Sequence, residues 1–494
     1  MKLELIGHDE RYTVEQNLLA FFPEERPSYD SISSGDGDWA RVTLNEHDAV
    51  CTVTTQIAFG GKTASASQSG LLRGTDYEQE GRRRRLIGHS FFAAARAVTG
   101  KTPAWGSLTG IRPAKMAAEL LEAGQSPQQA QDTLGETYFV SPPRRRMAVE
   151  AAAAGLAAQK DLTDRDVAVY IGIPFCPTRC AYCSFVSSSV EKSLAMVEPY
   201  VDALEAEVRA GGKLLADQGL RVRAFYMGGG TPTTLSASQM DRLLTTFKKS
   251  FDLSACTEYT VEAGRPDTIT PEKLEVLQKQ GVTRLSINPQ TMEDHVLRAI
   301  GRRHTADDIR RAMAQVRQAG FTHVNMDLIA GLPEDTVEGF RHSLDECLTF
   351  GCDNLTVHTL SLKKGSTILL KGLSIPTADA VAEMLDYADP ALRRAGYAPY
   401  YLYRQKYMSG SFENVGWCRP GGENLYNIYI MEELCSILSL GAGGSTKMVD
   451  MSSGRIARAF NLKYPKEYTE RPEKWQSNQA EFSAFYQELA KNQH

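Results

Sequence analysis

The sequence predicts an α/β protein built around a partial (β/α)6 barrel, and three observations lead to this fold class. Short runs rich in apolar and β-branched residues recur six times in the middle of the chain, each of strand length. Amphipathic segments of helical length separate them, for example 197–215 and 236–251. Near-continuous apolar strands that alternate with helices are typical of a parallel sheet covered on both faces, and six units are too few for a closed eight-stranded barrel. The six expected strands are 167–173, 222–227, 257–262, 282–287, 322–329 and 354–360.

The chain of 494 residues is long enough for several domains, and its two ends differ in composition from the middle. Residues 1–160 predict an N-terminal α+β accessory domain, and residues 161–365 form the expected barrel. Residues 366–494 begin as helix and are then rich in tyrosine, glycine and asparagine, which predicts a C-terminal mixed cap domain over the carboxyl edge of the sheet. An ordinary packed accessory domain fits the same composition. In the N-terminal domain we expect strands at 3–6, 40–44 and 49–57, a turn near Glu46 and His47, and helices at 81–98 and 147–158.

Composition and charge argue against several classes of protein. The net charge of −5 gives no reason to expect a nucleic-acid partner. The N-terminus lacks the apolar core of a signal peptide and no run is long enough to span a bilayer, so we expect a cytoplasmic protein without membrane insertion. Two arginine runs, 82–85 and 144–146, fit solvated faces or domain-edge contacts better than an anion site.

The first barrel strand is followed by three cysteines with the spacing C-x3-C-x2-C, namely Cys176, Cys180 and Cys183. Three thiolates can hold a [4Fe–4S] cluster and leave one iron without a protein ligand, which is how an α/β enzyme would present a reactive centre. A zinc site would require a second cysteine or histidine pair nearby, and an odd total of nine cysteines argues against disulfides. A distant cysteine remains a possible fourth ligand. The other six are Cys51, Cys256, Cys347, Cys352, Cys418 and Cys435.

Polar and glycine-rich motifs stand where the next strands end. The second strand runs into Gly229, Gly230 and Thr231, a turn that lets the backbone approach a ligand closely, and no Walker lysine follows to make it a phosphate loop. The third strand ends at Glu262, whose carboxylate suits ribose hydroxyls or an amine, although an ion pair with Arg265 is an alternative.

The fourth and fifth strands carry further polar residues at their ends. Gln290 follows the fourth strand and Arg302 comes twelve positions later, and both side chains suit an adenosine or a carboxylate. Asp327 interrupts the apolar fifth strand, and burying an unpaired carboxylate is too costly for it to serve packing alone. Four successive strands with such ends favour a ligand site at the carboxyl edge of the sheet.

The cysteine loop, with Tyr182 just before its third cysteine, resembles that of the radical S-adenosylmethionine enzymes. The surrounding residues are similar to the oxygen-independent coproporphyrinogen III oxidase (coproporphyrinogen dehydrogenase) group, including members with a long N-terminal extension. The resemblance implies a partial barrel and an open iron chelated by S-adenosylmethionine, which one electron cleaves to a 5′-deoxyadenosyl radical. The positions that match the family's S-adenosylmethionine site are Tyr170, Tyr182, Gly229, Gly230, Thr231, Glu262, Gln290, Arg302 and Asp327.

The same resemblance implies an oxidoreductase of haem biosynthesis that converts two propionates of coproporphyrinogen III to vinyl groups, giving protoporphyrinogen IX. An electron donor such as flavodoxin or ferredoxin is implied, and the propionates require cationic partners. One departure is Phe185, which stands where proven oxidases tend to have a further cysteine. Relatives without that cysteine include haem chaperones, so a protein that binds and transfers haem is the alternative, followed by a radical methyltransferase or a haem-degrading relative. The cationic candidates are Arg302, Arg303, Lys363 and Arg404.

Overall fold

The computed structural model of the protein describes residues 1–33, 35–110, 112–183, 188–361, 368, 372–405 and 409–492. Phe185 and Lys363 lie outside the described residues. The chain divides into two compact units. Unit 1 comprises Met1–Glu150, Thr377–Ala382 and Leu402–Glu413, and unit 2 comprises Ala151–Pro376, Glu383–Tyr401 and Asn414–His494. The three-domain division that the sequence suggests stays a prediction.

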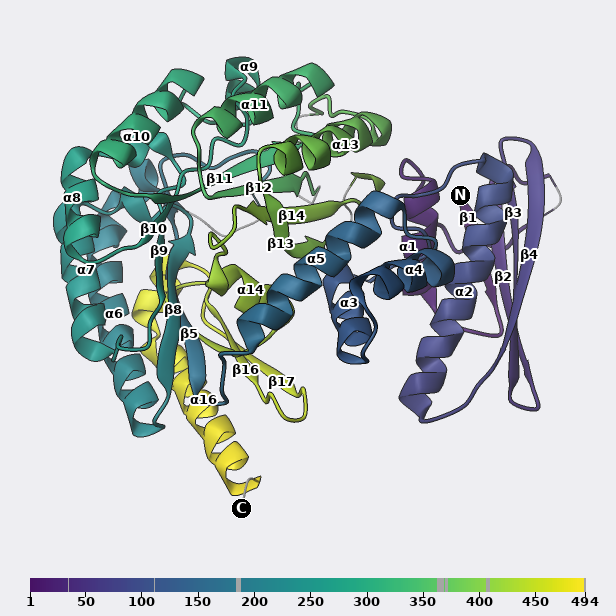
Figure 1. Ribbon diagram of the computed structural model, residues 1–494, viewed down its shortest axis with the longest axis horizontal. Helices are drawn as coiled ribbons and strands as arrows, with labels where there is room; N and C mark the ends of the chain where they lie inside the picture. The colour runs from purple at the N-terminus through teal and green to yellow at the C-terminus, as the bar shows by residue number, and fades with distance from the viewer. Residues whose placement is uncertain are drawn as a thin grey trace. The chain divides into compact units, whose positions relative to one another are not determined.

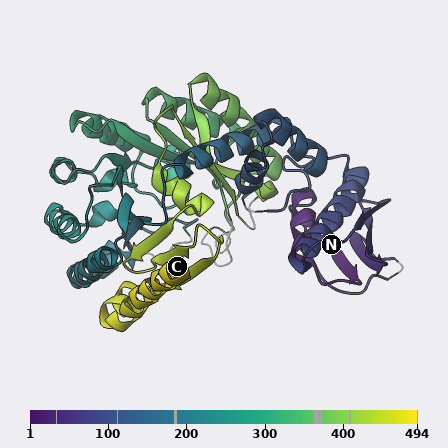
Figure 2. The same cartoon turned by 60° about the horizontal axis from the view of Figure 1, so that its bottom comes forward.

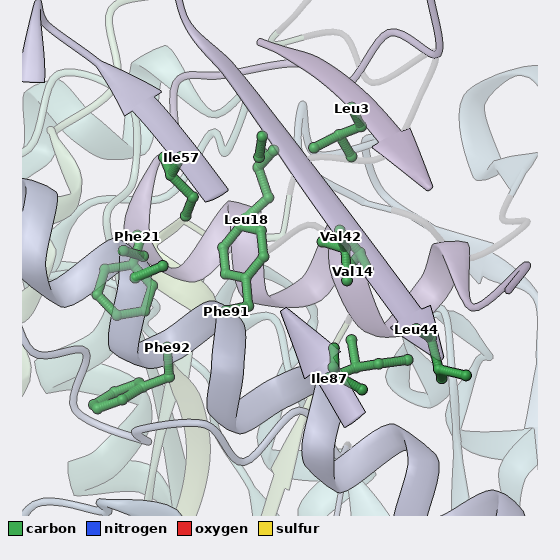
Figure 3. Packing of buried hydrophobic residues seen from close by; sticks show 14 of the residues in the cluster. Leu3, Val14, Leu18, Phe21, Val42, Leu44, Ile57, Ile87, Phe91 and Phe92 are labelled. Atoms are coloured by element: carbon green, nitrogen blue, oxygen red, sulfur yellow. The ribbon is translucent and has the colours of Figure 1, made fainter. Parts of the chain in front are cut away.

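Unit 1 begins with a four-stranded sheet in the order β1-β2-β3-β4, in which β1 and β2 are parallel and the other pairs antiparallel. Two helices pack against one face of this sheet and build an apolar core with it. Figure 3 shows Val42 and Ile57 from the sheet beside Leu18 of the first helix and Phe91 of the second. The elements are β1 (Lys2–Ile6), α1 (Arg11–Phe21), β2 (Trp39–His47), β3 (Val50–Phe59), β4 (Lys62–Leu71) and α2 (Asp76–Thr99).

The three strands expected in this region are confirmed, but the sequence analysis missed β4 and α1. Strand β4 is rich in serine and alanine and has little intrinsic strand preference, yet it pairs with β3 along its whole length. Cross-strand hydroxyl pairs such as Thr52 with Ser69, 2.8 Å apart, support that pairing. The tight turn expected near Glu46 and His47 is present two residues later, at Asp48 and Ala49, whose positive φ angles of 49° and 64° suit a tight hairpin.

The remaining helices of the N-terminal region are α3 (Pro113–Glu122), α4 (Pro127–Tyr138) and α5 (Pro142–Gln159). Within unit 1, Arg144 pairs with Glu413 at 2.9 Å and both side chains are almost fully buried. Trp105 donates a hydrogen bond of 2.6 Å to the other oxygen of Glu413. The 144–146 run is therefore not simply a solvated face, because Arg144 is a buried structural residue, whereas the 82–85 run forms exposed ion pairs such as Arg83 with Glu46.

Unit 2 contains the six parallel strands that the sequence predicts. They lie next to one another in the sheet, and helices between residues 190 and 349 cover one of its faces, as Figures 1 and 2 show in teal and green. The fold class is confirmed: a partial (β/α)6 barrel with an N-terminal α+β region. The strands are β5 (Asp166–Ile173), β8 (Arg221–Gly229), β9 (Glu258–Glu262), β10 (Arg284–Ser286), β11 (His323–Ala330) and β12 (Asn354–Thr359), and the helices between them are α6 (Val190–Asp217), α7 (Ala237–Ser250), α8 (Pro271–Lys279), α9 (Asp294–Ala299), α10 (Ala306–Gln318) and α11 (Val337–Thr349).

The two faces of this sheet differ in polarity. Phe225 points toward the helices, since its ring lies 4.1 Å from that of Phe247 on α7. Neighbouring Tyr226 points to the opposite face, where it donates a hydrogen bond to Glu262. Because side chains alternate along a strand, the polar residues of β9 to β12 gather on that second face. The face away from the helices is thus the one that can hold a polar ligand.

The C-terminal part of the chain extends the barrel sheet at both edges. The full order is β13-β14-β12-β11-β10-β9-β8-β5-β15-β16-β17, with β14 antiparallel to β12 and β15 parallel to β5. The sequence suggested a cap or accessory domain here, and it did not reveal these pairings. None of the helices in the described part of the chain is both long and apolar enough to cross a membrane. The elements are α13 (Ala378–Arg394), β13 (Ala398–Arg404), β14 (Glu413–Cys418), α14 (Leu425–Glu432), β15 (Ser436–Leu440), β16 (Ser445–Val449), β17 (Ile456–Phe460), α15 (Pro465–Glu470) and α16 (Pro472–Asn492).

Candidate active site

The three cysteines of the C-x3-C-x2-C motif lie on the loop that follows β5. The loop begins with the short strand β6 (Phe175–Cys176), which pairs with β7 (Ser188–Ser189), and Phe175 is buried against Tyr200 of α6 with ring centroids 5.3 Å apart. All three thiols are half-buried, and none of the nine cysteines, all of which are described, forms a disulfide. Within the described residues, no three cysteine, histidine or carboxylate side chains gather as tightly as one metal ion requires. A four-iron cluster does not need that closeness, because each thiolate binds a different iron.

Hydrogen bonds join the cysteine loop to the segment that follows α9. Ala181 donates its backbone N–H to the carbonyl of Ile300 at 2.9 Å, and the Thr178 hydroxyl donates to the carbonyl of Gly301 at 3.0 Å. Arg302, which is almost fully buried, donates from Nη2 to the Tyr182 hydroxyl at 3.2 Å. The structure therefore brings together at the cysteine loop Tyr182 and Arg302, two of the positions that the resemblance assigns to the cofactor site.

The glycine turn after β8 packs directly on this loop. Gly230 donates its N–H to the carbonyl of Ile173 at 2.8 Å, and Thr231 donates to that of Phe175 at 2.7 Å. A Cβ atom on Gly230 would lie 2.6 Å from the Phe175 carbonyl oxygen and 2.9 Å from the Cys176 sulfur. The Thr231 hydroxyl lies 3.6 Å from the same sulfur and donates to it. The sequence analysis expected the glycines to admit a ligand, but the residue at 230 has to be small because the cysteine loop itself approaches there.

Glu262 is buried at the end of β9, where it accepts a hydrogen bond of 2.6 Å from Tyr226. Burial raises the pKa of its carboxyl to about 7, against the opposing effect of the Tyr226 hydrogen bond, and the charge of Asp327 raises it further. The alternative of an ion pair with Arg265 is wrong, because Arg265 pairs with Asp267 at 3.0 Å. The protonation state of the Glu262 carboxyl therefore depends on its burial, on the neighbouring Tyr226 and Asp327, and on any ligand that binds beside it.

Asp327 lies in β11 and faces His358 of β12, with 3.8 Å between its Oδ2 and the imidazole Nε2. Asn325 donates a hydrogen bond of 2.8 Å to the other carboxylate oxygen. Burial would raise the pKa of Asp327, but His358 and the hydrogen bond from Asn325 hold it below its ordinary value. The sequence analysis missed His358, although a polar residue near the end of the sixth apolar run was the available signal.

Gln290 lies beside β11, where its N–H donates to the carbonyl of Asp327 at 2.9 Å. Its backbone has a φ of 70°, which is uncommon for a residue other than glycine and occurs often at functional sites. Its side-chain Oε1 is buried without a hydrogen-bond partner among the described residues. A ligand with an N–H or O–H group would supply that partner.

Tyr170 on β5 belongs to a group of three nearly parallel tyrosine rings. Its centroid is 6.3 Å from that of Tyr226 and 6.0 Å from that of Tyr426, while the last two lie 4.5 Å apart. Burial raises the pKa of the Tyr170 hydroxyl, so it remains protonated at neutral pH. The sequence analysis missed Tyr426, because only the docking of α14 places it against β8.

Two of the four cationic candidates are engaged elsewhere. Arg302 donates to Tyr182 and to the Asn288 carbonyl. Arg404, within unit 1, donates to the carbonyls of Leu108 and Ser411, and burial lowers its pKa to about 10. Neither guanidinium is arranged to bind a carboxylate through two parallel N–H groups.

Comparisons with known proteins agree with this geometry. A family model described as the Radical SAM superfamily matches residues 170–347. The chain is 37% identical over 500 residues to the oxygen-independent coproporphyrinogen-III oxidase-like protein HemZ of Bacillus subtilis (strain 168), and the match covers 100% of both chains. The chain belongs to the radical SAM superfamily, in its oxygen-independent coproporphyrinogen-III oxidase-like group.

Other relatives of this radical SAM protein match part of its length. It is 32% identical to the heme chaperone HemW of Mycobacterium tuberculosis (strain ATCC 25618 / H37Rv) over 267 residues, which cover 53% of this chain and 64% of that one. It is 32% identical to the oxygen-independent coproporphyrinogen III oxidase of Salmonella typhimurium over 248 residues, 50% and 53% of the two chains. The solved coproporphyrinogen III oxidase (HemN) from Escherichia coli is similar in fold, with a TM-score of 0.53 and 24% identity over 65% of this chain and 72% of that one.

Membership of the radical SAM superfamily implies a [4Fe–4S] cluster and S-adenosylmethionine, and the site residues fit both groups. Three thiols on one loop match the ligand set of a cluster with an open iron. The buried Oε1 of Gln290 and the carboxyl of Glu262 are acceptors of the kind that ribose hydroxyls and an amino group need. The turn at Gly230 keeps the Cys176 sulfur close to the end of the sheet.

Proposed function

We propose that this protein is a radical S-adenosylmethionine enzyme that decarboxylates coproporphyrinogen III to protoporphyrinogen IX without oxygen. The observation that carries the proposal is the juxtaposition of the cysteine loop with the glycine turn through Gly230 and Thr231. The full-length similarity to an oxygen-independent coproporphyrinogen-III oxidase-like protein supports the choice of reaction.

Each part of the site has a distinct role in this proposal. Cys176, Cys180 and Cys183 hold the cluster, while Gln290 and Glu262 accept hydrogen bonds from S-adenosylmethionine. The remaining matched positions complete the cofactor site: Tyr170, Tyr182, Gly229, Gly230, Thr231, Arg302 and Asp327. When bound, the two cofactors supply one-electron cleavage of a sulfonium and hence a carbon radical that abstracts hydrogen.

The reaction removes one hydrogen atom and one electron from each of two propionates. Carbon dioxide leaves from the carboxylate end, and the two remaining carbons become a vinyl group. The electron passes to a one-electron acceptor, and a donor such as flavodoxin or ferredoxin first reduces the cluster. We propose cationic partners for the carboxylates among the four candidates that the sequence offers, Arg302, Arg303, Lys363 and Arg404.

The test is anaerobic incubation of the reconstituted protein with S-adenosylmethionine, a reductant and coproporphyrinogen III. We expect 5′-deoxyadenosine and vinyl-bearing porphyrinogen to form together, and both to be absent from a Cys183→Ala variant. Formation of 5′-deoxyadenosine by the wild type without a vinyl product would rule out this substrate.

A second candidate is a haem chaperone of the same fold that binds and transfers haem without decarboxylation. The 32% identity to heme chaperone HemW over 267 residues favours it, as does Phe185 at the position of the further cysteine. A haem titration followed at the Soret band distinguishes the candidates, because saturable haem binding without vinyl product supports the chaperone. Methylated or ring-opened products would instead indicate a methyltransferase or a haem-degrading enzyme.

We also propose a cytoplasmic location and three domains at 1–160, 161–365 and 366–494. The nine cysteine thiols without disulfides are consistent with a reducing compartment. Limited proteolysis of the loaded protein tests the domain limits, since exposed linkers are cleaved first. Cuts near residues 160 and 365 are expected, and cleavage only inside the barrel strands would contradict the division.

A further inference from the structure

Arg265 lies just beyond β9 and joins the cysteine loop to the carboxylate of Asp267. The Arg265 side chain is only 3% exposed, whereas the Asp267 side chain is 27% exposed. Nη1 donates to the hydroxyl of Thr178 at 3.1 Å and to the Thr178 carbonyl at 3.3 Å. Nε and Nη2 donate to the two oxygens of Asp267, both at 3.0 Å. Thr178 lies midway between Cys176 and Cys180 in sequence, so Arg265 holds the loop between two thiols.

Among the described residues, Asp267 is the acidic group paired with this arginine, and it has His304 as a second neighbour. His304 is completely buried, with its Nδ1 at 3.7 Å from the Asp267 carboxylate. Burial lowers the pKa of His304, and Arg302 and Arg265 oppose a further positive charge there, so the ring is neutral at pH 7. The charged groups here are therefore Arg265, Arg302 and Asp267, and both arginines donate hydrogen bonds to the cysteine loop.

This arrangement has consequences beyond holding the loop in place. Because Arg265 is buried and Asp267 is partly exposed, removal of Asp267 would leave a poorly solvated guanidinium, whereas Asp267 alone would remain in contact with water. Hydrogen bonds and net charge around an iron–sulfur cluster also set its reduction potential. The arginine end of the pair contacts the loop and the aspartate end contacts His304, so the two charges do not act equally on a group bound by the loop.

We propose that Arg265 and Asp267 are positioning residues that hold the cluster-binding loop and tune the reduction potential of the cluster in opposite directions. The inference rests on the proposed function, since it requires a cluster on the three cysteines. Arg265 favours the reduced cluster, which carries one more negative charge, and Asp267 moderates that effect.

The test compares Arg265→Gln, Asp267→Asn and wild type after anaerobic reconstitution. Iron and sulfide content measures loading, and a redox titration followed by electron paramagnetic resonance gives the potential. We expect Arg265→Gln to disfavour reduction and Asp267→Asn to favour it. Each change is about tenfold in the equilibrium constant, or about 59 mV for one electron. Arg310→Gln is the matched control, because Arg310 forms exposed ion pairs with Asp307 and Glu346 on the outer helices and should leave the potential unchanged.

Shifts of the same sign in both variants, or no shift in either, would overturn the proposal, since a merely structural role does not separate the two signs. Thr178→Val covers the case in which Arg265→Gln does not fold, because it keeps both charges and removes the hydroxyl that accepts from Arg265 and donates to Gly301. This variant should release iron to a chelator at least twofold faster than wild type at an unchanged reduction potential. A wild-type release rate would contradict the proposal that Arg265 holds the loop. A wild-type protein that takes up no iron and sulfide overturns the proposed function itself. If the wild type is loaded but the two variants shift the potential in the same direction, only the proposed roles of Arg265 and Asp267 are overturned.

Discussion

Replacing Gly230 with alanine tests whether the glycine turn and the cysteine loop approach as closely as the structure shows. The new Cβ would lie 2.6 Å from the Phe175 carbonyl oxygen, 3.0 Å from the Ile173 carbonyl oxygen and 2.9 Å from the Cys176 sulfur. Ordinary contact begins at 3.4 Å, so the Phe175 carbonyl would have to move by about 0.8 Å. Two of the three neighbours are backbone atoms, which cannot rotate away as a flexible side chain would.

The expected cost follows from this crowding. Overpacking of a closely packed site costs about 1–3 kcal/mol. The hydrogen bonds from Gly230 to Ile173 and from Thr231 to Phe175 transmit the displacement to the first cysteine. We therefore expect Gly230→Ala to lower the free energy of unfolding by about 1–3 kcal/mol and to reduce iron and sulfide content at least twofold.

The assays are anaerobic urea unfolding of the cluster-free protein and iron and sulfide analysis after reconstitution. Gly81→Ala is the matched control: Gly81 lies within α2 with open space around it, and alanine should stabilise that helix by about 0.5–1 kcal/mol. A Gly230→Ala protein with wild-type cluster content and stability within about 0.5 kcal/mol of wild type would refute the close approach.

Three further predictions concern the cluster ligands, a buried carboxyl and a buried ion pair. Alanine at any one of the three loop cysteines should abolish the visible absorption of the cluster, whereas Cys435→Ala should keep it; loss of the cluster in Cys435→Ala would reveal a fourth ligand. Glu207 is a buried residue of α6, and burial raises the pKa of its carboxyl to about 7. Its stabilising contribution is therefore complete below pH 4.5 and is lost as the pH rises through 7, by on the order of 3 kcal/mol. Glu207→Gln should remove that pH slope from the unfolding free energy, and an unchanged slope would show that another group causes it. Glu413→Ala should destabilise unit 1 by about 3–5 kcal/mol, because it removes the carboxylate that pairs with the buried Arg144. Glu80→Ala, which breaks the exposed pair with Arg84, should cost under about 1 kcal/mol. Similar losses of unfolding free energy in the two variants, measured by urea unfolding, would contradict the burial of the Arg144–Glu413 pair.

The barrel was predictable because its signal is local. Each of the six parallel strands is an apolar run flanked by turn residues, and the run alone identifies the strand. The polar residues of the site follow from the same logic, since Glu262 and Asp327 stand where a buried strand carries a costly carboxylate. Their positions in the sequence therefore indicated a site before any contact was known.

Features that depend on contacts distant in sequence were not predictable. Strand β4 has weak intrinsic preference and forms because β3 pairs with it. The C-terminal strands join both edges of the barrel sheet, and no local pattern specifies the edge on which a strand adds. Likewise Arg265 looked like a partner for Glu262 three residues earlier, while the fold turns it toward Asp267 and Thr178.

The central claim is that Cys176, Cys180 and Cys183 hold a cluster with one iron open to S-adenosylmethionine. The most direct measurement is the electron paramagnetic resonance spectrum of the reconstituted, reduced protein before and after S-adenosylmethionine is added. We predict a [4Fe–4S] signal whose g values change on addition, because the cofactor binds the iron that no cysteine occupies. A cluster spectrum that stays identical with saturating S-adenosylmethionine would contradict the claim.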